Sequence, residues 1–102
     1  MMTLVLDIHA SLQQDVADCL RAHPAVENFT LAHVEGHGVQ AITSSAVSAR
    51  DKVVGYAPRV RVEILLQDDE VAHTLALLRQ QVSGISEHGV YWVTPLIQHG
   101  KL

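Results

Sequence analysis

Aromatic residues, proline and cysteine are scarce in this chain, and each scarcity narrows the class of protein. Among 102 residues there are one Trp, two Tyr, one Phe, three Pro and one Cys, whereas hydrophobic residues make up 48%. The hydrophobic residues are therefore mostly Val, Leu, Ala and Ile, which suit thin layers of sheet and helix. A chain of this length forms one globular domain.

The lone cysteine excludes two kinds of structural cross-link. Cys19 has no second cysteine to pair with, so an internal disulfide and a zinc cage made of cysteines are both ruled out within one subunit. Free cysteines are usually buried, and we expect Cys19 to behave as a small core residue. Such cysteine usage is typical of a reducing compartment, so we expect the protein to be cytoplasmic.

Basic residues are also too few for several classes of partner. Seven Lys and Arg against 11 Asp and Glu give a net charge of -4, which leaves no basic stripe for nucleic acid. No apolar run is long enough to cross a bilayer, and an alternating pattern directly follows Met1 and Met2. We therefore expect neither nucleic-acid binding nor direct membrane insertion.

The hydrophobic pattern predicts six elements. Alternation of apolar and polar residues indicates strands, and apolar residues at helical spacing indicate helices. Ser11 with Gln14 resembles a capping box, and Asp68 with Asp69 offers a cap for the second helix. The predicted strands are residues 3–9, 28–35, 59–66 and 90–93, and the predicted helices are residues 11–23 and 68–82.

The order β-α-β-β-α-β predicts an α+β fold, the ferredoxin-like plait, in which an antiparallel sheet carries both helices on one face. The other face is left uncovered, and alternation predicts which side chains lie on it. These are Val5, Asp7, His9, Arg59, Arg61, Glu63 and Leu65. A face of this mixed character can pack against copies of itself in a closed ring.

A long connection between the second and third strands carries the most specific pattern. Residues 34–40 read Val-Glu-Gly-His-Gly-Val-Gln, residues 57–64 read Ala-Pro-Arg-Val-Arg-Val-Glu-Ile, and residues 67–71 read Gln-Asp-Asp-Glu-Val. In order and spacing these runs resemble the PII signal-transduction family. The resemblance extends from Leu4 to Pro95 and treats residues 1–102 as one PII-like domain.

The resemblance implies a homotrimer that binds a ligand between subunits. It places a T-loop at residues 39–57, which would contact a partner protein, and a B-loop at residues 83–90. In the family a nucleotide lies between the base of the T-loop and the B-loop. Glycines there allow positive φ and a close approach of backbone N–H groups to phosphate. The residues that match the family pattern are Gly36, Gly38, Gln40, Gly84 and Gly89.

Two departures from the family pattern weaken the expected nucleotide site. Glu87 replaces a B-loop glycine and brings a carboxylate towards the polyphosphate position, and Val90 replaces a phosphate-binding lysine. We therefore expect ATP and ADP binding to be weak or absent. Another ligand is then needed for the same cleft.

Seven histidines suggest a metal as that ligand. His37 and His88 fall on the two loops, next to Glu35 and Glu87, and imidazole with carboxylate suits Zn, Ni, Co or Cu. His37, His88 and Glu87 are the predicted ligands, with His9 as a further candidate. The alternative is that these are ordinary polar residues, as we expect for His23 and His73, which the pattern places on the surface.

The sequence favours a binding protein over an enzyme. No nucleophile elbow, catalytic triad or phosphate-cradling loop with an arginine is present. The main hypothesis is a PII-like sensor that binds a small ligand or a divalent metal ion and signals through its T-loop, with a membrane transporter as one candidate partner. PII-like proteins that resemble this chain are found beside heavy-metal efflux systems. The alternative is a CutA-like metal-tolerance trimer that binds no nucleotide.

Overall fold

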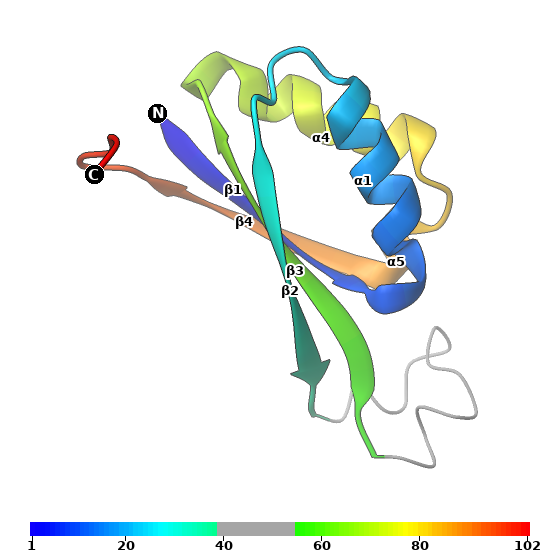
Figure 1. Ribbon diagram of the computed structural model, residues 1–102. Coiled ribbons are helices and arrows are strands. Elements are labelled where there is room, and N and C mark those ends of the chain that lie inside the picture. The colour runs from blue at the N-terminus through cyan, green and yellow to red at the C-terminus, as the bar shows by residue number, and fades with distance from the viewer. Residues whose placement is uncertain (39–54) are drawn as a thin grey trace.

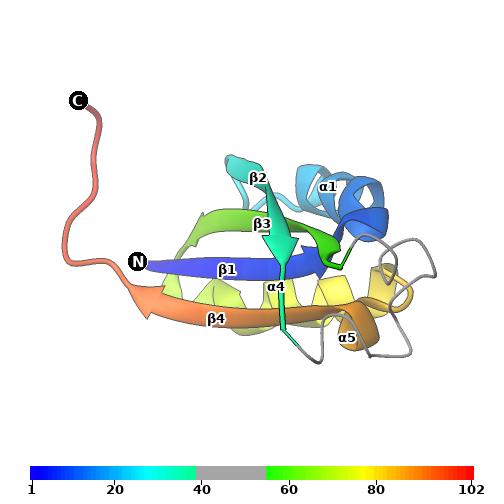
Figure 2. The same ribbon diagram turned by 90° about the horizontal axis from the view of Figure 1, so that it is seen from below.

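The computed structural model describes residues 1–38 and 55–102, which form one four-stranded antiparallel sheet covered by helices on one face (Figure 1). The strands lie in the order β2-β3-β1-β4 (Figure 2). They are β1 (Met2–His9), β2 (Phe29–Gly36), β3 (Ala57–Leu66) and β4 (Gly89–Pro95), and the main helices are α1 (Gln13–Ala22) and α4 (Val71–Gln81). The predicted α+β plait is confirmed.

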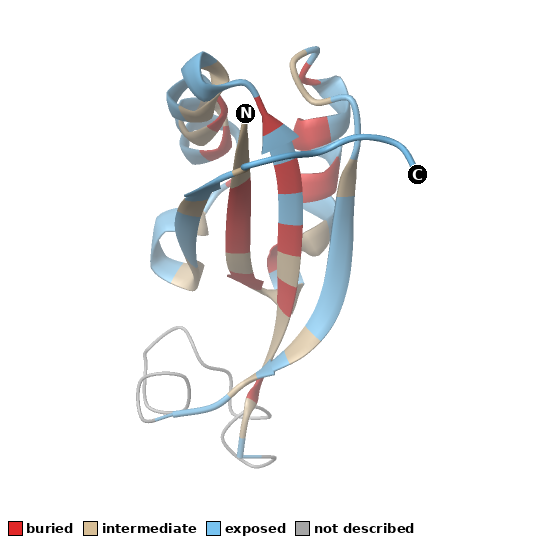
Figure 3. Ribbon diagram, turned by 90° about the vertical axis from the view of Figure 1, so that its left-hand side faces the viewer, coloured by how far each residue is buried: buried red, intermediate tan, exposed pale blue. Residues whose placement is uncertain are grey.

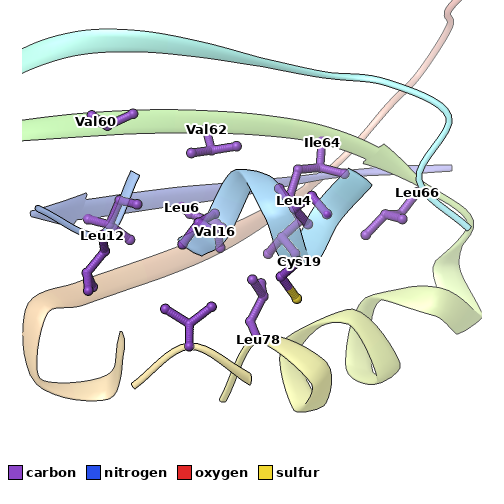
Figure 4. Close-up of a cluster of buried hydrophobic side chains, with 13 residues drawn as sticks. Leu4, Leu6, Leu12, Val16, Cys19, Val60, Val62, Ile64, Leu66 and Leu78 are labelled. Carbon is purple, nitrogen blue, oxygen red and sulfur yellow. The ribbon is translucent and has the colours of Figure 1, made fainter. Parts of the chain in front are cut away.

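The core lies between the sheet and the two helices. In the register of β1, Leu4 pairs with Ile64 of β3 and Val93 of β4, so alternate residues of neighbouring strands share the helix-covered face. Leu20 of α1 and Leu78 of α4 close this core from the other side. Figure 4 shows the cluster, whose labelled members include Leu4, Leu6, Leu12, Val16, Cys19, Val60, Val62, Ile64, Leu66 and Leu78.

The opposite face of the sheet has no covering layer within the described part of the chain. The central strands β1 and β3 alternate between buried and accessible residues, whereas the edge strands β2 and β4 are mostly exposed (Figure 3). Large apolar side chains lie among the charges on this face, with Leu65 at 44% and Trp92 at 39% exposure. The face is mixed, as its sequence predicts.

The first helix begins differently from the prediction. The predicted capping box of Ser11 and Gln14 is wrong, because a short 3-10 helix, η1 (Ala10–Leu12), precedes α1. His9 caps η1: its Nδ1 accepts a hydrogen bond from the backbone N–H of Ser11 at 3.1 Å. Gln14 instead donates from its side chain to Asp18, one turn later, at 2.9 Å. The chain turns directly at the end of β1, so the imidazole reaches the free N–H first.

The second helix also begins without the predicted cap. Asp68 and Asp69 lie inside a 3-10 helix, η2 (Asp68–Glu70), whose N-cap Gln67 makes no capping bond with its side chain. The carboxylate of Asp68 instead pairs with the amino group of Met1 at 2.7 Å. The start of β1 thus lies beside the start of this helix, which the sequence pattern does not reveal.

The bounds of the two predicted loops differ from the prediction. The predicted B-loop, residues 83–90, is not a loop throughout, since it contains a helical turn, α5 (Ile85–His88), and the start of β4. The predicted T-loop, residues 39–57, ends inside β3, where Ala57 pairs with Gly36. Residues 39–54 lie outside the described residues. Among the helices that the structure describes, none is long and apolar enough to span a membrane.

Candidate functional site

One arginine joins three elements at the end of the sheet from which segment 39–54 departs. Arg59 of β3 donates from Nε to the carboxylate of Asp7 on β1, and a second nitrogen donates to the Asp7 carbonyl at 2.7 Å and the His88 carbonyl of α5 at 3.3 Å. Arg61 donates to the other carboxylate oxygen of Asp7 at 3.3 Å. We call Gly36, Asp7, Arg59, Arg61 and His88 the loop-base cluster.

Gly36 belongs to this cluster because it leaves room for the arginine. A Cβ atom at Gly36 would overlap Cδ of Arg59 and lie 3.1 Å from its Cγ. The arginine is held by Asp7 and cannot move away freely. The glycine is therefore required here for space, and not for the positive φ that the family resemblance suggested.

The other predicted glycines have distinct local roles. Gly38 and Gly84 have positive φ, 121° and 79°, which L-residues with a side chain rarely adopt. Gly89 is extended, but a Cβ there would lie 2.9 Å from Cγ2 of Ile8 and 3.0 Å from the carbonyl oxygen of Ile85. Gly84 thus allows the turn into α5, and Gly89 allows β4 to start against β1.

Among the predicted metal ligands His37, His88 and Glu87, His88 is the one that belongs to the loop-base cluster. Its Nδ1 is buried and has no hydrogen-bond partner among the described residues, and its ring lies 6.3 Å from the ring of His9. Glu87 precedes it on α5 and is exposed. His88 therefore offers a ring nitrogen that the fold does not use.

His37 lies at the base of segment 39–54. Its Nε2 and a carboxylate oxygen of Glu35 are 2.9 Å apart, and its ring lies 5.7 Å from that of Tyr56. Within one chain, the donor atoms of His37, His88 and Glu87 do not meet in a group of three. Gln40 lies outside the described residues. Whether these residues form a ligand site between subunits stays a prediction.

A crevice of about 380 Å³ lies next to the α5 turn, between α4, α5, β1 and β4. Its lining is mostly apolar and includes Leu78 and Ile85. Arg79 also lines it, with its guanidinium 5.7 Å from the ring centre of Tyr91. Such a crevice suits a small ligand with an apolar part and an anionic group.

A second group of donors, which the sequence reading missed, lies between α1 and α4. His23, Glu70 and His73 place one donor atom each within 4.8 Å of one another, and no other such group occurs among residues 1–38 and 55–102. The expectation of a surface position is wrong for His23, which is 6% exposed, but His73 is exposed as expected. The spacing of Glu70 and His73 puts them on one helix face, whereas only the fold adds His23.

Cys19 does not take part in either group. It packs in the core on α1, and burial raises the pKa of its thiol above the usual 9.0. The thiol is therefore protonated at neutral pH, and a protonated thiol is neither a nucleophile nor a metal ligand. The expectation that Cys19 is a small core residue is confirmed.

The comparisons with known proteins identify the family. A family model described as "Protein of unknown function (DUF3240)" matches residues 1–102, so the chain belongs to the DUF3240 family. A crystal structure of a DUF3240 family protein from Shewanella baltica OS155 matches with a TM-score of 0.76 and 22% identity, covering 99% of this chain and 94% of that one. The two proteins share the fold. No curated protein sequence matches.

Proposed function

We propose that this DUF3240 family member is a PII-like regulatory protein, a homotrimer that binds a small ligand or a divalent metal ion and signals through segment 39–54. One observation carries the proposal. Arg59, at the base of that segment, bonds both to β1 and to the turn that precedes β4. A ligand at this end of the sheet would therefore act on the base of the segment directly.

The strands that precede and follow segment 39–54 meet at the same arginine. Gly36, the last residue of β2, leaves room for the Arg59 side chain, and Ala57, the first residue of β3, pairs with Gly36 in the β2-β3 ladder. The same guanidinium also donates a hydrogen bond to the carbonyl oxygen of His88. A ligand that moves the α5 turn would shift Arg59 and, with it, the end of β2 and the start of β3, which flank the segment.

The ligand that this end favours is a metal ion or a small anion with an apolar part, and not ATP. The unpartnered Nδ1 of His88 and the His37-Glu35 pair offer nitrogen and oxygen donors that two neighbouring subunits could combine. Glu87 and Val90 oppose a polyphosphate, as the sequence predicts. The protein would then be a cytoplasmic binding protein and not an enzyme, with its partner, for example a membrane transporter, on segment 39–54.

A CutA-like metal-tolerance trimer is the second candidate function. The donor group of His23, Glu70 and His73 favours it, because this group needs no neighbouring subunit and no signalling segment. In that case metal binding alone would be the function. The two candidates differ in whether ligand binding changes segment 39–54.

Sedimentation equilibrium and calorimetry test the main proposal. We expect a mass three times the chain mass of 11.1 kDa. Titration with Zn²⁺, Ni²⁺, Cu²⁺, ATP and ADP should show binding of at least one metal that weakens in His37→Ala and His88→Ala, and little or no nucleotide binding. Limited proteolysis of segment 39–54 should change when the ligand is added. A monomer, or a proteolysis pattern that no titrated ligand changes, would contradict the proposal.

A further inference from the structure

We propose that His23, Glu70 and His73 form a binding site for a divalent transition-metal ion within a single chain. His23 directly follows α1, Glu70 ends η2, and His73 lies in the first turn of α4. Strand β3 begins at Ala57, beside the loop-base cluster, and ends at Leu66, after which η2 and α4 follow, so the site lies in the helix layer at the other end of the sheet. It is thus separate from the loop-base cluster.

The distances between the donor atoms fit a shared metal ion. Oε2 of Glu70 lies 3.8 Å from Nε2 of His23 and 3.5 Å from Nδ1 of His73. In a tetrahedral site with metal–ligand bonds of about 2.0–2.1 Å, neighbouring ligand atoms are about 3.3 Å apart. Small side-chain rotations would close the difference, and the two imidazole rings already lie edge to face with centres 5.2 Å apart.

The carboxylate of Glu70 is the strongest sign that a cation belongs here. Its Oε2 is buried and has no hydrogen-bond partner among the described residues, although two imidazole nitrogens face it. A buried carboxylate oxygen without a partner is costly. A metal ion bound by Glu70, His23 and His73 would satisfy the oxygen and both nitrogens together.

Thr74 keeps a hydrogen bond of its own when His23 becomes a ligand. The Thr74 hydroxyl donates to the Glu70 carbonyl oxygen at 2.8 Å, and its oxygen lies 3.1 Å from Nε2 of His23. In the metal-free protein, Nε2–H can donate to that hydroxyl. When a metal takes Nε2, the ring proton is carried on Nδ1 instead, and Thr74 keeps its bond to the carbonyl.

The donor set selects a class of metal. Two imidazoles and one carboxylate suit Zn²⁺, Co²⁺, Ni²⁺ or Cu²⁺, whereas Mg²⁺ and Ca²⁺ prefer a shell of oxygens. Three protein ligands leave at least one position open for water or an exchanging ligand. The side chain of His73 is 61% exposed, which gives the ion a path from solvent.

Titration of the full-length protein with Co²⁺ and Zn²⁺ tests the site. We expect this site to take one ion per chain, counted apart from any ion bound at His37 and His88, with Co²⁺ giving the visible absorption of a low-symmetry site, and a higher melting temperature in excess Zn²⁺. His73→Ala and Glu70→Gln should weaken binding on the order of a hundredfold, since even outer-shell substitutions cost about 10–100-fold. His33→Ala and His99→Ala, which each remove an exposed imidazole, are matched controls and should leave this binding unchanged.

Two results would overturn the proposal. One is that neither ion binds the wild-type protein, and the other is that binding is equal in wild type, His73→Ala and Glu70→Gln. His73 is exposed, so His73→Ala should fold normally, and circular dichroism checks this. The result can be told apart from that of the proposed regulatory function, because this test compares variants of His73 and Glu70, whereas the regulatory proposal is tested with variants of His37 and His88.

Discussion

Asp7 receives hydrogen bonds from two arginines of the neighbouring strand and is the charge on which the loop-base cluster depends. Its side chain is only 15% exposed, and that of Arg59 is 19% exposed, so both charges are largely removed from water. An ion pair in such surroundings is costly to break, because the remaining charge stays buried without a partner. The pair fixes the end of β3 against β1.

Replacement of this carboxylate tests its role. Asp7→Asn keeps the shape but removes the charge, so we expect the free energy of unfolding to fall by about 1–3 kcal/mol. Urea denaturation measures the change. Asp18→Asn is the matched control, since Asp18 pairs with Arg21 on the surface at 3.4 Å and such pairs contribute little. Equal losses in the two variants would show that the Asp7 network adds no stability.

At the scale of elements, the turn that contains α5 depends on a glycine with a left-handed backbone. Gly84 has a φ of 79° and precedes the four residues of α5, whose last carbonyl, that of His88, is bound by Arg59. A four-residue helix has little stability of its own. Its position is therefore determined by Gly84 before it and by the start of β4 after it.

Gly84→Ala tests this dependence. We expect a loss of about 1–2 kcal/mol in the free energy of unfolding from the left-handed backbone, plus a further loss because the new Cβ would lie 3.2 Å from Cδ2 of His88. Gly55→Ala is the matched control: φ is 84° there, but beyond its chain neighbours no atom of the described residues lies within 4 Å of the added Cβ. In thermal or urea unfolding, Gly84→Ala should be less stable than Gly55→Ala. The reverse order of stability would contradict this account.

At the scale of the whole molecule, the uncovered sheet face bears on assembly. Trp92 of β4 lies on this face, with the Arg61 guanidinium 5.2 Å from its ring centre, and Leu65 of β3 lies on the same face. Partly exposed aromatic and aliphatic side chains among charges are typical of surfaces that associate. The proposed trimer would bury this face.

Trp92→Ala should therefore weaken the proposed trimer. We expect the mass in sedimentation equilibrium to fall from three chains towards one at low micromolar concentration, because the substitution removes the largest apolar side chain of the face. Tyr91→Ala is the matched control, because Tyr91 is the neighbouring residue on the opposite side of β4 and is also about half exposed. If both variants sediment as the wild type does, another surface holds the copies together.

The sequence by itself determined the order of the strands and main helices and the side of the sheet that carries the core. Alternation in β1 and β3 and helical spacing in α1 and α4 are local patterns, and burial follows them directly. The run of residues 34–40, which resembles the PII family, also marked the end of the sheet at which the loop-base cluster lies. These features depend on residues close together in the chain.

Only the tertiary structure decided the caps, the small helix α5 and the second donor group. His9 replaced Ser11 as a cap because the chain turns directly at the end of β1, and Asp68 paired with Met1 because the start of β1 lies beside the start of η2, far away in sequence. His23 is buried because α1 ends against the start of α4, where Glu70 and His73 lie. Contacts between segments about 50 residues apart do not alter the local hydrophobic pattern. The sequence around His23 could therefore not predict its contacts with α4.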